Sequence, residues 1–157
     1  MNRRLILALT ALAVPAPLIL TSCAPAPPPP PVLTITINGT AEQNPDATGH
    51  AAPVAVRVYQ LSGTAKFMQS DVFALKDNEA KTLGPEEATT SQEFLIAPGD
   101  SKTVTIDLKP MVSSIGVAVL YRDIDQAQWR AVAAAKPNGP TTLTATIGKL
   151  AVTAKGG

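Results

Sequence analysis

The sequence has few of the residues that carry catalytic or metal-binding chemistry. Its 157 residues include one cysteine, one histidine and one tryptophan, and aromatic residues make up 4% of the chain. A single cysteine excludes a disulfide within the chain. A single histidine, with no further thiols or clustered carboxylates at ligand spacing, makes neither a metal site nor a catalytic set. We therefore expect no enzyme activity, no cofactor and no metal.

An excess of charge of either sign is also missing. The chain has 13 Lys and Arg against 12 Asp and Glu. Binding to nucleic acid normally needs a strongly basic surface, and no glycine-rich phosphate loop follows a predicted strand. The sequence therefore favours neither a nucleic-acid partner nor a small-molecule substrate.

The longest apolar run extends from Leu5 to Leu20. It is shorter than the roughly 20 apolar residues that cross a bilayer, and two prolines interrupt it. Two arginines precede it and small residues follow it, which is the order of a secretory signal. We assign residues 1–22 to a signal peptide.

Cys23 ends this signal. Together with Leu20, Thr21 and Ser22 it forms the pattern, leucine then two small residues then cysteine, that bacterial lipoprotein-processing enzymes recognise (the lipobox). We expect cleavage before Cys23 and acylation of that residue. The alternatives are an ordinary signal peptide with a chance cysteine, or a signal anchor. Ala24, in place of an Asp, favours the outer membrane, with the folded part facing the periplasm.

Residues 23–31 are rich in proline and favour an extended polyproline II tether. Such a segment has a rise of about 3.1 Å per residue, so it spans on the order of 25 Å. Residues 32–157 remain for one folded domain of ordinary size. The tether is expected to hold this domain away from the membrane surface.

Alternating apolar and polar residues predict about eight short strands in this domain. An all-β, two-sheet antiparallel β-sandwich accounts for this pattern, and a closed barrel is the alternative architecture. The predicted strands cover residues 33–38, 54–59, 91–96, 103–108, 115–120, 129–135, 141–147 and 150–153.

The residues of three connections between the predicted strands indicate their local structure. Pro98-Gly99 predicts a type II turn, and Gly148-Lys149 predicts a two-residue type II′ hairpin turn. Residues 66–78 break the strand pattern and predict a short helical insertion of one or two turns that covers one end of the core. The stretch that follows, up to Ala88, is polar and has the composition of a flexible segment.

Isolated polar residues are interpreted as structural. We expect His50 to be solvated or packed within a loop, and the acidic pairs Glu86-Glu87 and Asp123/Asp125 to be solvated. Trp129 is expected in the core, with a surface anchor for a partner as the alternative. The two mid-strand arginines, Arg57 and Arg130, are expected to face solvent or to pair with a carboxylate on an adjacent strand.

The order of these pieces resembles the type VI secretion system lipoprotein family TssJ, also called VasD or SciN. The likeness covers residues 23–153, and its specificity lies in the ordered set of motifs. These are the lipobox at Cys23, Asn44-Pro45-Asp46, Pro53 to Leu61, Phe67, Asp71 to Leu75, Pro98-Gly99, Ile115 to Arg122, and Trp129-Arg130.

The resemblance implies a transthyretin-like β-sandwich on the inner leaflet of the outer membrane. It implies that this domain anchors a trans-envelope complex by binding the periplasmic C-terminal region of the inner-membrane protein TssM, with TssL in the same complex. In the family the loop after the first strand, here Gly39 to Ala52, is associated with TssM contact. The implied partner-binding residues are Glu42, Gln43, Asn44, Pro45, Asp46, Ala47 and Thr48.

Two other classes of function remain open at this point. One is a periplasmic ligand-binding or chaperone-like β-sandwich lipoprotein, because sandwiches support many binding functions. It would need a pocket or an exposed strand edge that takes a peptide. The other is an envelope hydrolase, which would need a catalytic role for His50.

Overall fold

Alternation of apolar and polar residues builds the first strand of the computed structural model, which describes residues 29–157. In β1 (Val32–Gly39) the side chains of Leu33, Ile35 and Ile37 are fully buried. Thr34 and Thr36 lie on the opposite face, because successive side chains of a strand point to opposite sides. None of the helices among the described residues is long and apolar enough to cross a membrane.

One four-stranded sheet contains β1. Its order is β4 (Ser101–Asp107), β1, β7 (Pro140–Ile147) and β8 (Val152–Gly156). β1 pairs antiparallel with β4 but parallel with β7, whereas the other pairings of both sheets are antiparallel. The alternation that predicts a strand is the same for both directions, so the parallel pair was not visible in the sequence.

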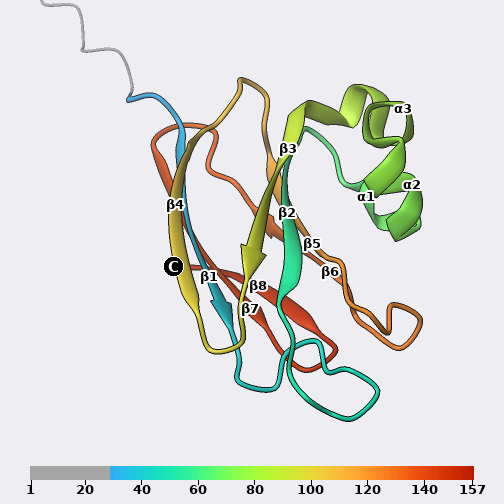
Figure 1. Ribbon diagram of the computed structural model, residues 1–157. Coiled ribbons are helices and arrows are strands. Elements are labelled where there is room, and N and C mark those ends of the chain that lie inside the picture. The colour runs from blue at the N-terminus through green and yellow to red at the C-terminus, as the bar shows by residue number, and fades with distance from the viewer. Residues whose placement is uncertain (1–28) are drawn as a thin grey trace, which may run out of the picture.

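The second sheet has the order β3 (Glu87–Ile96), β2 (Val54–Leu61), β5 (Ser114–Val119) and β6 (Arg130–Ala134). It faces the first sheet across the main apolar core (Figure 1). At one edge the two sheets are joined, because Gln128 donates to the Leu150 carbonyl and accepts from the Val152 amide, at 2.8 and 3.0 Å. The predicted sandwich is confirmed, and the barrel alternative is wrong.

Four connections cross from one sheet to the other: those between β1 and β2, β3 and β4, β4 and β5, and β6 and β7. The type II turn at Pro98-Gly99 is confirmed, since Gly99 has a φ of +78° and Asp100 N donates to Ala97 O at 3.1 Å. The type II′ turn at Gly148-Lys149 is wrong: Ile147 pairs with Val152, which leaves a four-residue loop.

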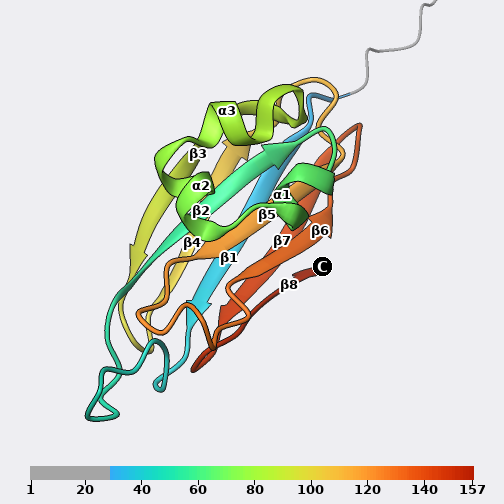
Figure 2. The same cartoon turned by 90° about the vertical axis from the view of Figure 1, so that its right-hand side faces the viewer.

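The insertion between β2 and β3 is longer than predicted. It comprises α1 (Ala65–Gln69), α2 (Val72–Asp77), α3 (Glu79–Leu83) and the 3₁₀ turn η1 (Gly84–Glu86). These helices cover the outer face of the second sheet and not one end of the core (Figure 2). The stretch up to Ala88, predicted as flexible, is therefore helix and the start of β3.

Capping explains where these short helices begin. The Asp71 carboxylate accepts from the amides of Phe73 and Ala74, at 2.9 Å each, and so caps α2. The Glu86 carboxylate accepts from Lys66 N at 2.8 Å and satisfies a free amide of α1. Glu86 is thus part of the fold and not the solvated charge that the sequence predicted.

A second apolar cluster joins the insertion to the sheet. It consists of Tyr59, Leu61, Phe67, Leu75, Leu83 and Ala118. The rings of Tyr59 and Phe67 are 5.2 Å apart between centroids and tilted by 56°, a favourable aromatic geometry. The second sheet is therefore buried on both faces at this point, which explains why residues 115–119 are apolar throughout.

Gly116 makes this packing possible. A Cβ on Gly116 would lie 2.9 Å from Phe67 Cζ and 3.0 Å from Leu61 Cδ1. Both neighbours are fully buried and cannot move away freely. Because Gly116 has no side chain, Phe67 can contact the backbone of β5.

We predict that Gly116→Ala destabilises the fold by about 1–3 kcal/mol, because an added methyl group would overpack this cluster. Urea unfolding measures the change. Gly156→Ala is the matched control, since a Cβ on this strand glycine meets nothing within 4 Å. Equal unfolding free energies for the two variants would contradict the packing role of Gly116.

Candidate functional site

The loop between β1 and β2, residues 40–53, lies at the end of the sandwich opposite the point where the chain enters β1 (Figure 1). Three other connections reach the same end: residues 97–100, 120–129 and 148–151. The structure therefore gathers loops that are far apart in sequence around the segment that the resemblance associates with partner contact. We call the first of them the β1–β2 loop.

Gln43 is the internal support of the β1–β2 loop. Its side chain is fully buried, and Nε2 donates to the carbonyl oxygens of Ile96 at 2.8 Å and Ala52 at 3.3 Å. Its Oε1 is buried without a hydrogen-bond partner and lies where a Cβ on Gly39 would be. Gln43 therefore ties the loop to the end of β3 and cannot contact a partner directly.

Asn44 connects three loops. Its Nδ2 donates to Pro53 O at 2.9 Å, its Oδ1 accepts from Arg122 N at 2.8 Å, and its own amide donates to Lys149 O at 3.1 Å. Its φ of +46° lies in the left-handed region, which asparagine tolerates better than most residues. Buried polar groups that are fully paired fix a single arrangement of the chain.

Asp46 organises the tip of the loop. Its Oδ1 accepts from Thr48 Oγ1 at 2.6 Å, Thr48 N at 2.8 Å and His50 N at 3.0 Å. The hydroxyl of Thr48, followed by the amide of His50, lowers the pKa of Asp46 to about 2. Asp46 is therefore charged throughout the neutral range. His50 is 83% exposed, which confirms a solvated loop histidine.

The seven predicted partner-binding residues therefore divide into two groups. Gln43 and Asn44 are buried and structural. The others are exposed or half-buried: Glu42, Pro45, Asp46, Ala47 and Thr48. Sequence reasoning missed the residues from other loops that complete an open depression beside Pro45, Asp46 and Ala47; these are Arg122, Asp123, Lys149 and Leu150.

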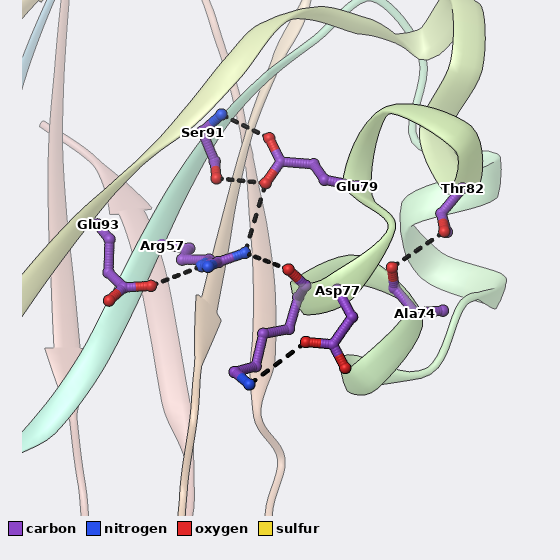
Figure 3. Close-up of polar contacts among 8 residues, drawn as sticks. Arg57, Ala74, Asp77, Glu79, Thr82, Ser91 and Glu93 are labelled. Atoms are coloured by element: carbon purple, nitrogen blue, oxygen red, sulfur yellow. Dashed lines mark hydrogen bonds and ion pairs between the residues drawn. The ribbon is translucent and has the colours of Figure 1, made fainter.

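Arg57 holds the helical insertion on the sheet (Figure 3). Its Nε donates to Glu93 Oε2 on the neighbouring strand at 2.7 Å, and Nη1 donates to Lys76 O at 3.1 Å. Glu79 Oε2 lies 3.5 Å from the same Nη1. The predicted pairing of Arg57 with a carboxylate on an adjacent strand is confirmed, and its reach to α2 and α3 is additional.

Arg130 has a different environment from the one predicted. Its Nη1 donates to the carbonyl oxygens of Phe67 and Ser70, at 2.9 and 2.6 Å, and its guanidinium carbon lies 4.5 Å from the Trp129 ring centroid. The expectation that Arg130 faces solvent or pairs with a carboxylate is therefore wrong. Its guanidinium donates instead to carbonyl oxygens at the C-terminal end of α1, which have no partner within the helix. Trp129 is half-buried and packs against both apolar clusters.

Glu79 and Glu87 form a partly buried carboxyl pair beside Arg57. Ser91 donates to Glu79 from its amide and its hydroxyl, at 2.6 Å each. Burial acts to raise the pKa of Glu79, but hydrogen bonds from Glu87 and Ser91 outweigh it and lower the pKa. Burial and the adjacent Glu79 raise the pKa of Glu87 to about 7. Glu87 is therefore not the solvated charge that the sequence predicted.

We predict that Glu87→Gln stabilises the fold at pH 8 and has little effect at pH 5. A carboxyl whose pKa is raised in the folded state stabilises fully below its unfolded pKa, and that contribution is lost as pH rises to about 7. Glutamine keeps the uncharged form. We expect a gain on the order of 1 kcal/mol, because the pair is partly exposed.

Urea unfolding at the two pH values measures this gain. The titratable and charged groups that face Glu87 are Glu79 and, through Glu79, Arg57. Glu86→Gln is the matched control, since Glu86 accepts a hydrogen bond from the Lys66 amide as a carboxylate. A stability difference between wild type and Glu87→Gln that does not change with pH would refute the raised pKa of Glu87.

The remaining predictions concern the acidic pair Asp123/Asp125, a metal site and the lipobox. Asp123 and Asp125 are exposed, as expected. Among residues 29–157 no group of three or more His, Cys, Asp or Glu side chains could hold a metal ion. The lipobox residues Leu20, Thr21, Ser22 and Cys23 lie outside the described residues, as do the signal peptide and most of the tether.

Comparison with known proteins identifies the family. A family model described as type VI secretion lipoprotein, VasD, EvfM, TssJ matches residues 31–150. The crystal structure of the T6SS lipoprotein TssJ1 from Pseudomonas aeruginosa superposes with a TM-score of 0.77 at 32% identity, over 82% of this chain and 98% of that chain. No curated protein sequence matches the chain.

Two further structures share the fold. Serratia marcescens Lip, described as a membrane-bound component of the type VI secretion system, gives a TM-score of 0.68 at 21% identity, over 82% of this chain and 96% of that one. One chain of a structure described as the T6SS protein TssM C-terminal domain from EAEC gives a TM-score of 0.60 at 23% identity, over 80% of this chain and 97% of that chain. The family match and the identity to TssJ1 confirm the resemblance: the chain belongs to the type VI secretion lipoprotein family that includes TssJ and VasD.

Proposed function

We propose that this lipoprotein anchors the trans-envelope complex of the type VI secretion system at the outer membrane. In this proposal acylated Cys23 holds residues 32–157 in the periplasm, and the exposed part of the β1–β2 loop binds the periplasmic C-terminal region of TssM, with TssL in the same complex. The observation that carries the proposal is that the entry point of the chain and the β1–β2 loop lie at opposite ends of β1.

This arrangement separates the anchor from the partner surface. The eight residues of β1 span about 26 Å at a rise of about 3.3 Å per residue. A polyproline tether over residues 23–31 would add on the order of 25 Å. The β1–β2 loop would then face the inner-membrane side of the periplasm, where TssM and TssL are expected.

The lipid anchor has the strength that this role needs. Each buried CH₂ group of an acyl chain contributes about 0.8 kcal/mol, and a single chain gives only marginal attachment. A fully acylated Cys23 would carry several chains and would hold the domain durably. The helices of the described residues offer no membrane span, so attachment in this proposal rests on the lipid.

The rigidity of the β1–β2 loop supports a binding role. Gln43 and Asn44 fix the loop from within, and Asp46 fixes its tip. A loop that is ordered before binding loses less conformational entropy when it meets its partner. The exposed positions Glu42 and Ala47 are thus presented on a fixed support.

We predict that Glu42→Arg combined with Ala47→Arg weakens binding to the purified TssM periplasmic region by about tenfold or more, which is about 1.4 kcal/mol. Both positions are exposed, and the double variant keeps the buried Gln43 and Asn44, which a deletion of residues 42–48 would remove. Isothermal titration calorimetry measures the affinity.

Thr105→Arg is the matched control for this experiment, because Thr105 is exposed on β4, away from the loop end. It should bind like wild type, and both proteins should unfold at the same urea concentration. Unchanged affinity of the correctly folded double variant would overturn the assignment of the loop.

We predict that Cys23→Ser separates the two halves of the function. The purified variant should bind the TssM region with wild-type affinity, because Cys23 precedes the folded domain. In cells it should leave the outer-membrane fraction, and secretion through the system should fall to background. Normal secretion by a variant that is absent from the membrane would refute the anchoring role.

A further inference from the structure

Two large apolar side chains of the insertion face solvent. Phe73 on α2 is 61% exposed and Met68 on α1 is 48% exposed. The insertion already packs on the sheet through Phe67, Leu75 and Leu83, which are fully buried. The fold therefore does not require an aromatic residue at position 73 or a methionine at position 68.

Phe73 forms one wall of a surface groove, which we call the α2 groove. Its lining is mostly apolar, and Val72 within it is buried. One wall comes from α2 and the other from the segment after β5. The lining residues are Val72, Phe73 and Lys76 from α2 and Leu120, Tyr121, Arg122 and Ile124 from the segment after β5.

The charged residues that line this groove are Lys76 and Arg122, and no carboxylate of the described residues lines it. Asp77 lies outside the lining and places its Oδ1 3.3 Å from Lys76 Nζ, with both side chains about half exposed. A mostly apolar lining with two cationic side chains is complementary to an apolar segment that carries a carboxylate. It fits a basic or a purely polar segment poorly.

The α2 groove and the depression beside the β1–β2 loop share one residue, Arg122. The backbone amide of Arg122 is held by Asn44 Oδ1 at 2.8 Å. The backbone of the residue that the two surfaces share is therefore held by the loop.

We propose that the partner that binds the β1–β2 loop also places an apolar segment bearing an acidic residue in the α2 groove. Phe73 is the aromatic anchor of this contact, and Lys76 and Arg122 receive the carboxylate. The inference rests on the proposed function, since it assigns a second contact to the same TssM periplasmic region. Aromatic residues at the centre of an interface often carry much of its binding energy.

Position 73 can be altered without damage to the insertion. The Phe73 amide is held by the Asp71 cap at 2.9 Å through its backbone, and its side chain is more than half exposed. Substitutions at such positions usually change the unfolding free energy by no more than about 0.5 kcal/mol. A loss of binding would then report on the contact itself.

We predict that Phe73→Ser weakens binding to the TssM periplasmic region by about tenfold or more. Met111→Ser is the matched control, because it removes an apolar side chain that is 85% exposed between β4 and β5, away from the β1–β2 loop. It should bind within about twofold of wild type. Calorimetry with the full mature chain gives the affinities, and urea unfolding checks the fold.

A charge variant tests the second half of the inference. Lys76→Glu should weaken binding further as salt is lowered, because repulsion of the partner's carboxylate is screened less. The control is Lys109→Glu, an exposed lysine outside the groove. Equal effects of the two lysine variants would contradict the proposed carboxylate contact.

The outcomes separate this inference from the proposed function. If the β1–β2 loop variant loses binding and Phe73→Ser does not, the groove is not a contact and the proposed function stands. If neither variant loses binding, the proposed function fails and the inference with it. A concentration-dependent dimer of the wild-type chain that Phe73→Ser abolishes, with TssM binding unchanged, would assign the groove to a second copy and overturn the proposal.

Discussion

The contact of Phe67 with the bare backbone of β5 at Gly116 determines where the helical insertion lies. A side chain on β5 at this point would push Phe67 away, and α1 would lose its place on the sheet. The carbonyls at the end of α1 are then within reach of Arg130, and α2 and α3 are within reach of Arg57. The orientation of the α2 groove therefore depends on one glycine in a central strand.

At the loop end, the buried side-chain amides of Gln43 and Asn44 hold the β1–β2 loop in place. Gln43 and Asn44 form hydrogen bonds with backbone carbonyls and amides. The inner side of the β1–β2 loop is therefore buried and hydrogen-bonded, although its outer residues face water. Removing one partner of such a buried pair leaves an unsatisfied polar group, which costs more than the bond itself contributes. Binding residues can thus vary on the surface of this loop while its support stays the same.

Local pattern predicted the strands and the sandwich well, because alternation and turn residues are local properties. It predicted neither the parallel pairing of β1 with β7 nor the extent of the insertion, since both depend on segments that are distant in sequence. The family's loop was found through resemblance, whereas the burial of Gln43 and Asn44 required the structure. The predictions for Glu86 and Glu87 were wrong for the same reason: the pKa of Glu87 is raised because the folded chain buries it and places Glu79 against it.

The position of β1 has a mechanical consequence. β1 lies between β4 and β7, paired along nearly its whole length on both sides. If the chain is held at the start of β1 and the partner at its end, tension runs along the strand. The inter-strand hydrogen bonds are then loaded in shear, so they share the force and must fail together. A strand pulled from the edge of a sheet would instead lose its bonds one after another. In the proposed anchoring, a strand that is paired on both sides thus lies on the line between the two membranes.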